Sequence, residues 1–262
     1  QKTMRQLTYT SAQYTSPNRD IGGFARIIPS TIFYLKFIGI VCRSASEAKK
    51  GIYDDIAWNN SSFEVWELLE SIGVNIEVTG VKNVEAVDGP CVFIGNHMSM
   101  METLLLPAIL TPLKKVTFVV KQDLLEYTVF KHVMRSRDPI AVTRTNPRQD
   151  LKTVMSEGMK KLKEGCSVIV FPQTTRAHHF DPEQMSTIGV KLAKKAGVPV
   201  VPIALKTDAW TNGQLMKDFG KFDLSKSNHF TFGEQLRIEG KGGEEHDQVN
   251  AFIEKSLASW GA

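Results

Sequence analysis

The sequence predicts an α/β fold with a mostly parallel central sheet flanked by helices, preceded by an N-terminal helical, membrane-associating segment. Short runs rich in Val and Ile alternate with helical patterns along most of the 262 residues, and this alternation is typical of a parallel sheet covered on both faces. A chain of this length can bury one large core. Several of the apolar runs end in polar residues, which predicts a ligand site at the carboxyl edge of the sheet.

Each element of this fold has its own sequence signal. Short apolar runs predict strands over residues 74–80, 91–95, 116–121, 139–144, 166–171, 199–205 and 229–236. Apolar residues at helical spacing predict helices over residues 63–72, 101–110, 123–135, 147–164, 183–196 and 247–260. Asn146 and Pro147 are a typical N-cap and first-turn proline. Gly165 and Gly197 are expected to close two of the helices, the second with Pro199 just beyond it.

Four of the predicted strands run into residues that can bind an anion or move a proton. Following the chain, these residues are Asn96 with His97, then Lys121, Arg144 and Arg176. If the four strands are parallel, their carboxyl ends lie at one edge of the sheet, and one imidazole and three cations converge there. The sequence therefore predicts an anion-binding site beside a histidine base.

His97 and Glu102 are five residues apart, a spacing that would separate them by about 140° within one regular helix. We therefore expect His97 in the loop between strand and helix, and Glu102 in the first turn, with Ser99 as the N-cap. Glu102 could then hydrogen-bond one imidazole nitrogen and leave the other as a general base. The spacing from Ser99 to Glu102 is also that of a capping box, so a purely structural role for Glu102 is the alternative.

The first 50 residues differ from the rest in charge. They carry eight Lys or Arg and two acidic residues, a net charge of +6, whereas the whole chain carries +4. Within them, residues 24–42 are rich in Ile, Phe and Leu, but Arg26, Pro29 and Lys36 interrupt the run. A spanning helix needs about 20 mostly apolar residues, and the pattern of a secretory signal is poor. We therefore expect a helix that lies in the plane of a membrane interface.

These patterns divide the chain into a basic amphipathic helical segment, residues 1–59, and an α/β domain, residues 60–262. The apolar side chains expected at the membrane are Ile27, Ile28, Ile32, Phe33, Phe37 and Ile38. A soluble helix packed on the domain is the alternative. Because the four residues at the sheet edge all follow residue 90, we expect the chemistry itself to need nothing from the N-terminal segment.

Four segments resemble blocks of the glycerolipid acyltransferase family, the 1-acylglycerol-3-phosphate acyltransferases and their relatives. NHMSMMET at 96–103 resembles the block N-H-x-S-x-x-D and contains the HX4D/E motif, and FPQTTR at 171–176 is similar to F-P-E-G-T-R. AVTR at 141–144 resembles the intervening block that ends in Arg, and VPIAL at 201–205 matches the last apolar block. The four blocks occur in the family's order, and the likeness covers roughly residues 60 to 240.

The resemblance implies acyl transfer from a thioester to a lipid hydroxyl, most simply 1-acylglycerol-3-phosphate to phosphatidate. It implies that His97 deprotonates the hydroxyl, that Glu102 orients His97, and that Arg144 and Arg176 hold the acceptor's phosphate, with Lys121 as a weaker candidate. Arginine suits this role because its planar fork binds phosphate oxygens bidentately. The donor would be an acyl-carrier protein or coenzyme A thioester, with no cofactor and no metal. The acceptor implies membrane lipids as partners, at the cytoplasmic face of a membrane.

The chain departs from the family's blocks at three positions. Glu102 replaces Asp, Gln173 replaces Glu and Thr174 replaces Gly. The loops that would support the pair are formed by Asn96, Ser99, Gln173, Thr174 and Thr175. Loss of the anion at position 173 changes the charge balance beside the arginines, so a different acceptor, such as a lyso-ornithine lipid, is the first alternative. A catalytically inactive lipid-binding relative is the second.

Other functional signals are weaker. The pair His178 and His179, with Asp181, lacks further spaced ligands and is poor support for a metal site. The aromatic residues are scattered and show no nucleic-acid platform, and the serines lack the G-x-S-x-G elbow of a hydrolase. The three cysteines, Cys42, Cys91 and Cys166, do not fit a zinc ribbon, and we expect them to be reduced and mostly buried.

Overall fold

The alternating strands assemble into one sheet in the computed structural model, which describes residues 3–128, 130–173, 175–213 and 217–262. The strands are β1 (Gln13–Thr15), β2 (Asn75–Thr79), β3 (Val92–Gly95), β4 (Val116–Lys121), β5 (Ile140–Val142), β6 (Ser167–Val170), β7 (Val200–Lys206) and β8 (Ser227–Phe232). Their order across the sheet is β1-β2-β8-β7-β3-β6-β4-β5. Only the pairs β1–β2 and β7–β8 are antiparallel, so the prediction of a mostly parallel sheet is confirmed.

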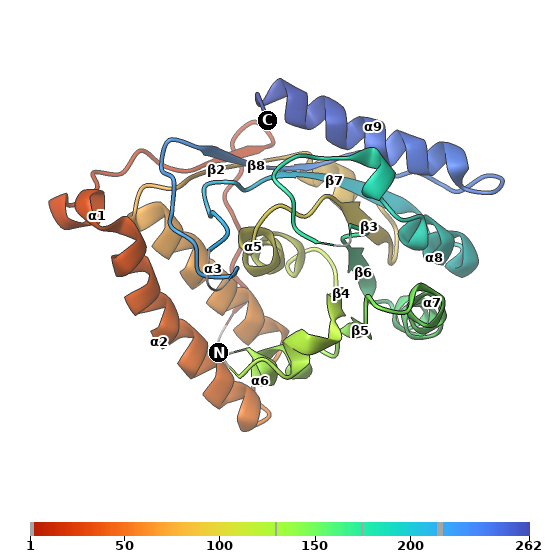
Figure 1. Cartoon of the computed structure of the whole chain (residues 1–262), viewed down its shortest axis with the longest axis horizontal. Helices are drawn as coiled ribbons and strands as arrows, with labels where there is room; N and C mark the ends of the chain where they lie inside the picture. Colours follow the sequence, from red (N-terminus) through yellow and green to blue (C-terminus); the bar gives the residue numbers. More distant parts are fainter. Residues whose placement is uncertain (1–2, 129, 174, 214–216) are drawn as a thin grey trace.

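The helices cover both faces of this sheet. They are α1 (Gly23–Ile27), α2 (Pro29–Lys49), α3 (Asp55–Ser71), α4 (Val81–Glu85), α5 (Met101–Leu110), α6 (Lys131–Ser136), α7 (Pro147–Lys163), α8 (Ile188–Ala196) and α9 (Gly243–Ser259), with 3-10 turns η1 (Gln122–Leu125) and η2 (Pro182–Gln184). In Figure 1, α2 and α3 lie to the left of the sheet, and α7 and α8 lie to its right. The α/β class with helices on both faces is therefore confirmed.

Two hydrophobic cores result, one on each face. Phe33 of α2, Trp66 of α3 and Leu105 of α5 belong to the first core, which also receives Phe93 of β3. The second core joins buried side chains of α7, α8 and α9, and Ile94 of β3 points into it. Since consecutive strand residues face opposite sides, β3 contributes to both cores, as expected for a strand buried on both faces.

The helix termini agree in part with the sequence signals. The side chain of Asn146 accepts a hydrogen bond from the backbone of Gln149 at 3.1 Å, and Gly197 has the left-handed φ of 67° that closes α8. The N-cap of α5 is Met100, so the assignment of Ser99 as N-cap was wrong by one residue. The Ser99 hydroxyl instead accepts from the backbone of Met101 at 3.1 Å.

The predicted helix over 123–135 is wrong as one element, because the chain forms η1 and α6 with a break between them. At the end of η1, the carbonyl of Leu125 accepts a hydrogen bond from Nε of Arg135 in α6 at 2.9 Å. The predicted helix over 183–196 likewise divides into η2 and α8. There the backbone of Ser186 donates to Pro172 at 3.3 Å and draws the chain towards the end of β6.

The N-terminal segment is part of the same body as the α/β domain. The expected division after residue 59 falls inside α3, and β1 adds a strand to the sheet. Tyr14 and Ser16 donate hydrogen bonds to the buried carboxylate of Glu70 in α3. These contacts depend on single polar residues and on a three-residue strand, which carry no periodic signal.

The two faces of α2 have different surroundings. Phe33 and Phe37 are buried in an aromatic cluster with Trp210 and Phe222, so the prediction that they face a membrane is wrong. The large apolar side chains left exposed are Ile27, Ile28, Leu35, Ile38 and Ile52. None of the helices in the described ranges combines the length and the apolar character needed to cross a membrane. Of the three free cysteines, Cys91 and Cys166 are buried and Cys42 is exposed.

Candidate active site

The predicted convergence of strand ends occurs in the fold. The strands β3, β6, β4 and β5 are neighbours and run parallel, so their carboxyl ends share one edge. Five of the residues expected at the site line a single cavity at that edge: His97, Lys121, Arg144, Thr175 and Arg176. Thr174 lies outside the described residues.

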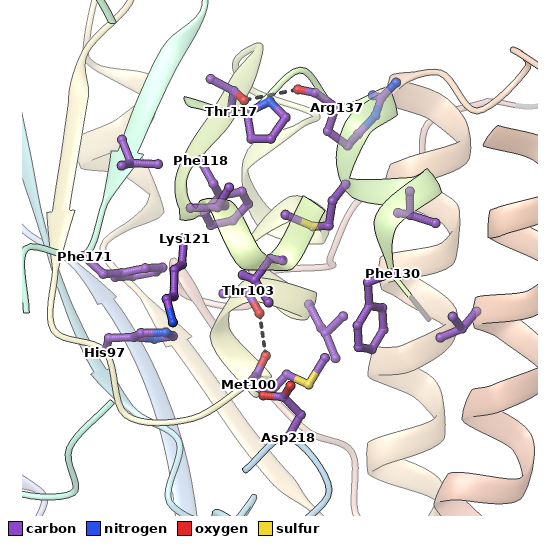
Figure 2. A pocket seen from close by; sticks show the side chains of 18 of the residues that line it. His97, Met100, Thr103, Thr117, Phe118, Lys121, Phe130, Arg137, Phe171 and Asp218 are labelled. Atoms are coloured by element: carbon purple, nitrogen blue, oxygen red, sulfur yellow. Dashed lines mark hydrogen bonds between the residues drawn. The ribbon is translucent and has the colours of Figure 1, made fainter. Parts of the chain in front are cut away.

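His97 occupies the loop between β3 and α5 and is held from several directions. Its Nδ1 lies 2.9 Å from Oε1 of Glu102. Its ring stacks on Phe171, with 4.6 Å between centroids and 9° between the planes, as Figure 2 shows. Its backbone N–H donates to Oε1 of Gln173 at 2.6 Å, and its carbonyl accepts from Ala177 at 3.0 Å. With Nδ1 directed at a carboxylate, Nε2 is the nitrogen available to a substrate.

Glu102 is fully buried and both caps the loop and orients the imidazole. Its Oε1 also accepts from the backbone N–H groups of Met98 at 2.5 Å and Ser99 at 2.9 Å. Its Oε2 accepts from the hydroxyls of Ser99 at 3.1 Å and Thr207 at 2.6 Å. Burial alone would raise the pKa of Glu102, but the hydrogen bond and charge of His97, with the bonds from Thr207 and Ser99, lower that pKa below its ordinary value.

Thr207 completes this network and was missed by the sequence analysis. It follows β7, its hydroxyl donates to Oε2 of Glu102, and its oxygen lies 2.9 Å from the hydroxyl oxygen of Ser99. The rule that found the other residues, a polar side chain directly after a parallel strand, also applies to β7. The predicted strand ended at residue 205, so the rule indicates Lys206 first, and Thr207 follows the strand only because β7 extends to Lys206.

The supporting residues fix the backbone around the pair. Asn96 is buried, and its side chain donates to the carbonyl of Leu205 at 2.7 Å and accepts from its N–H at 2.9 Å. Gln173, also buried, holds the N–H of His97. The side chains of Asn96, Ser99 and Gln173 thus position the loop, whereas Thr175 lines the cavity itself.

Arg144 and Arg176 line the same cavity as His97. Arg144 has a left-handed backbone with φ of 59°, which is stabilised because its N–H donates to Asp150 at 2.7 Å. Burial lowers the pKa of Arg144, and the charge of Arg176 acts in the same direction, partly offset by Asp150. An anion between the two arginines would relieve this repulsion.

Arg176 and Lys121 each have a carboxylate partner. Arg176 Nη2 donates to Asp218 Oδ1 at 2.6 Å, inside the cavity. Lys121 pairs with Asp123 at 2.5 Å and is half exposed. An exposed ion pair of this kind contributes little to stability. Lys121 was the weakest of the three candidates for binding phosphate. Asp218 lies 42 residues from Arg176, and no sequence signal indicates it.

The cavity has a volume of about 550 Å³ and is mostly apolar. Its wall follows β4 from Thr117 to Lys121, a length of roughly 13 Å at about 3.3 Å per strand residue. In the view of Figure 2, His97 and Asp218 lie towards one end, and Thr117 with Arg137 lies at the other. Apolar lining comes from α2, α3, α5 and α6 through Phe37, Val65, Leu104 and Met134, among others, and from β4 through Phe118.

The far end of the cavity is held by Arg137. Its carbonyl accepts from Thr117 at 3.2 Å, and its guanidinium donates to Asp55 at 2.7 Å and to the carbonyl of Tyr53 at 2.5 Å. These bonds join α6 to the start of α3. In the part of the chain that the structure describes, no group of three His, Cys, Asp or Glu side chains is arranged to hold a metal ion.

A family model described as Acyltransferase matches residues 75–206, half of the chain. The chain belongs to the acyltransferase family. The sequence resemblance is thereby confirmed, and the matched range contains His97, Glu102, Arg144 and Arg176. As a member of this family, the chain is an enzyme that moves an acyl group from a donor to an acceptor.

Individual relatives agree with the family match. A 1-acyl-sn-glycerol-3-phosphate acyltransferase of Pseudomonas aeruginosa is 29% identical over 210 residues, 79% of this chain and 78% of that protein. A chloroplastic protein of the same name from Brassica napus is 29% identical over 129 residues, which are 49% of this chain but 36% of that protein. The crystal structure of the 1-acyl-sn-glycerophosphate (LPA) acyltransferase of Thermotoga maritima matches with a TM-score of 0.65 and 19% identity, covering 91% of this chain and 97% of that one. At this identity the structural match shows the shared fold.

The buried carboxylate predicts a pH-dependent contribution to stability. Since the pKa of Glu102 is lowered on folding, its contribution is present above the ordinary pKa of about 4.3 and is lost as the pH falls through the lower pKa of the folded state. We expect Glu102→Gln to lower the free energy of unfolding by about 1.5–3 kcal/mol at pH 7, and the difference to shrink in acid. Urea unfolding between pH 7 and pH 3 measures this.

The control for this experiment is Glu254→Gln, which changes an exposed carboxylate of α9. It should have almost no effect at any pH in this range. If the difference between wild type and Glu102→Gln did not change with pH, the carboxylate would not be stabilised by its hydrogen bonds.

Proposed function

We propose that the chain transfers an acyl group from a thioester to the free hydroxyl of 1-acylglycerol-3-phosphate, which gives phosphatidate. One observation carries the proposal: the His97–Glu102 pair opens onto an apolar cavity whose rim also carries Arg144 and Arg176. The names of the Pseudomonas aeruginosa and Brassica napus relatives support the choice of acceptor.

In the proposed mechanism, Nε2 of His97 accepts the proton of the acceptor hydroxyl. The hydroxyl oxygen attacks the thioester carbonyl carbon as the proton leaves. Glu102 holds the imidazole and stabilises the imidazolium that forms. The tetrahedral intermediate collapses, the carbon–sulfur bond breaks, and His97 returns the proton to the thiolate that leaves. One ester and one thiol are the products, and the residues return to their starting protonation states. No metal or cofactor takes part in these steps.

The two guanidinium groups are proposed to bind the acceptor's phosphate. The Arg176–Asp218 pair means that an incoming phosphate must share or replace the carboxylate. A dianionic phosphate monoester competes for the guanidinium better than a singly charged diester, because attraction scales with charge. Asp218 thereby favours lysophosphatidate over lysolipids that carry larger headgroups.

The apolar cavity is proposed to hold an acyl chain beside the reacting groups. Its volume of about 550 Å³ lies within the usual range for ligand pockets, roughly 300–1,000 Å³. The donor is an acyl-carrier protein or coenzyme A thioester. Phe37, Ile40 and Val41 of α2 line the cavity, so in this proposal the N-terminal segment forms part of the wall that binds the acyl chain.

The outer face of α2, together with Ile27 at the end of α1, is proposed to contact a membrane, as a peripheral or monotopic attachment on the cytoplasmic side. Ile27 is 77% exposed, Leu35 is 71% exposed and Ile38 is 52% exposed. Clusters of exposed large apolar side chains mark interaction surfaces, and the basic charge of the first 50 residues suits anionic headgroups. One helix then connects the lipid surface with the cavity.

A second acceptor class is favoured by one observation. Gln173 removes an anion from the loop after β6, but Asp218 places another beside Arg176. A carboxylate in this position could bind the ammonium group of an aminolipid such as a lyso-ornithine lipid. The reaction and the roles of His97 and Glu102 would be unchanged.

The proposed general base has a direct test. His97→Ala should lower the turnover number about 10²–10⁴-fold without loss of the folded state. The assay supplies acyl-carrier protein or coenzyme A thioesters with a panel of lysolipids, and mass spectrometry identifies the acylated products. Lys255→Ala is the control, because that side chain is exposed on α9, outside the cavity lining, and should change turnover little. Near-normal turnover by folded His97→Ala protein would exclude the mechanism.

The acceptor is tested at Asp218. Asp218→Asn should lower the KM for lysophosphatidate on the order of tenfold, because one competing charge is removed. The KM for a lyso-ornithine lipid should rise if its ammonium group uses the same carboxylate. Asp123→Asn provides a matched control outside the cavity lining. A higher KM for lysophosphatidate in Asp218→Asn would show that the carboxylate orients Arg176 and does not compete for it.

The membrane face is tested by the triple variant Ile27→Ser, Leu35→Ser and Ile38→Ser. These side chains are exposed, so the fold should be retained. Vesicle binding should fall at least about tenfold, since burial of each side chain in lipid is worth about 1.5–3 kcal/mol. Co-sedimentation with anionic and neutral vesicles across a salt series separates the apolar from the electrostatic part. Activity on a soluble short-chain acceptor is the control, and unchanged vesicle binding would contradict the proposal.

A further inference from the structure

A shallow groove on the outer surface of α7 and α8 has no role in the proposed reaction. It is lined by Arg148, Leu151, Lys152, Met155, Ser156, Met159 and Lys195. Six of the seven residues belong to α7, and Lys195 comes from the last turn of α8. The groove therefore follows the axis of α7 along its boundary with α8.

The floor of this groove is an apolar stripe. Leu151, Met155 and Met159 are spaced four residues apart, so they lie along one side of α7. They extend over about 12 Å at about 1.5 Å per residue, and each is partly exposed. Methionine side chains adapt to the shape of a partner. An apolar stripe of this kind is typical of a groove that receives the apolar face of another helix.

The surroundings of the stripe are strongly basic. The exposed basic side chains of α7 and α8 are Arg148, Lys152, Lys160, Lys163, Lys191, Lys194 and Lys195. The exposed carboxylate on these two helices is Glu157. The other acidic residue of α7, Asp150, is buried and bonded to the backbone of Thr143 and Arg144. A negatively charged partner therefore meets little repulsion here.

The position of the groove separates it from the proposed membrane contact. The helices α7 and α8 pack on the second core, whereas α2 packs on the first, so they lie on opposite faces of the sheet. Figure 1 shows α2 and α7 on opposite sides of the molecule. The helix α7 also begins at Pro147, two residues after Thr145, which lines the cavity with Arg144. A partner on the groove is thus next to the rim and away from the lipid-facing helix.

We propose that this groove is the docking site for an acidic, helical acyl-carrier protein that delivers the thioester to the cavity rim. The proposal rests on the proposed function and selects one donor for it. A helix with acidic residues beside its apolar face complements both the stripe and the basic border. A coenzyme A thioester would have no need of the apolar floor, and an anionic membrane would require α7 and α2 to face the same surface.

The test compares two double variants, each of which replaces two lysines of α7 or α8 by glutamate and so reverses the same amount of charge. Lys152→Glu with Lys195→Glu changes the groove lining, whereas Lys160→Glu with Lys163→Glu changes exposed positions of α7 outside it. We expect the groove variant to raise the KM for acyl-carrier protein thioester on the order of tenfold. The KM for acyl coenzyme A should stay unchanged, and the control variant should affect neither. The difference should diminish at high salt.

Three results would overturn the proposal. Equal effects of both variants would mean that only net charge matters, and equal effects on both donors would place the groove outside carrier recognition. Transfer from acyl coenzyme A alone would exclude the carrier protein and leave the proposed function standing. If wild-type protein used neither donor, the proposed function would fail. Calorimetric titration with acyl-carrier protein would then decide the docking alone, with binding expected to the wild type and lost in the groove variant.

Discussion

The buried carboxylate of Glu102 organises the site, because a charge without solvent needs a full set of hydrogen-bond donors. Five donors surround it: His97 Nδ1, the N–H groups of Met98 and Ser99, and the hydroxyls of Ser99 and Thr207. These donors belong to the loop after β3 and the end of β7. The carboxylate can stay ionised only if both segments are in place, so the folded state and the orientation of the imidazole depend on the same set of bonds.

The cavity depends on a different constraint, the packing of α2 against the first core. Phe33 and Phe37 anchor the helix to Trp210 and Phe222, and Phe37 also lines the cavity. The helix cannot move without disturbing the aromatic cluster. Its outer side chains are under no such constraint. The helix α2 has apolar side chains on two sides. One side can line the cavity while the other contacts lipid.

Local sequence signals predicted the parts of the site that depend on strand ends. Position after a parallel strand was enough to place His97, Lys121, Arg144 and Arg176 at one edge, and the five-residue spacing was enough to put His97 and Glu102 together. Asp218 was not predictable, because it is 42 residues from Arg176 in the sequence and no periodicity connects the two. The two apolar sides of α2 were misassigned for a related reason, since hydrophobicity alone cannot distinguish a protein core from a lipid surface.

The side chain of Asn96 continues the hydrogen bonding between β3 and β7 beyond the point where the backbone of β3 leaves the sheet. The main-chain pairing of these strands reaches Gly95 and Ile203, and the amide of Asn96 then bonds both polar groups of Leu205. The chain can turn out of the sheet towards His97 while β7 keeps its donor and acceptor satisfied. This position requires a side chain that both donates and accepts. Aspartate has the same size, but it would set a second oxygen against the Leu205 carbonyl and so separate the two strands at the point where the catalytic loop begins.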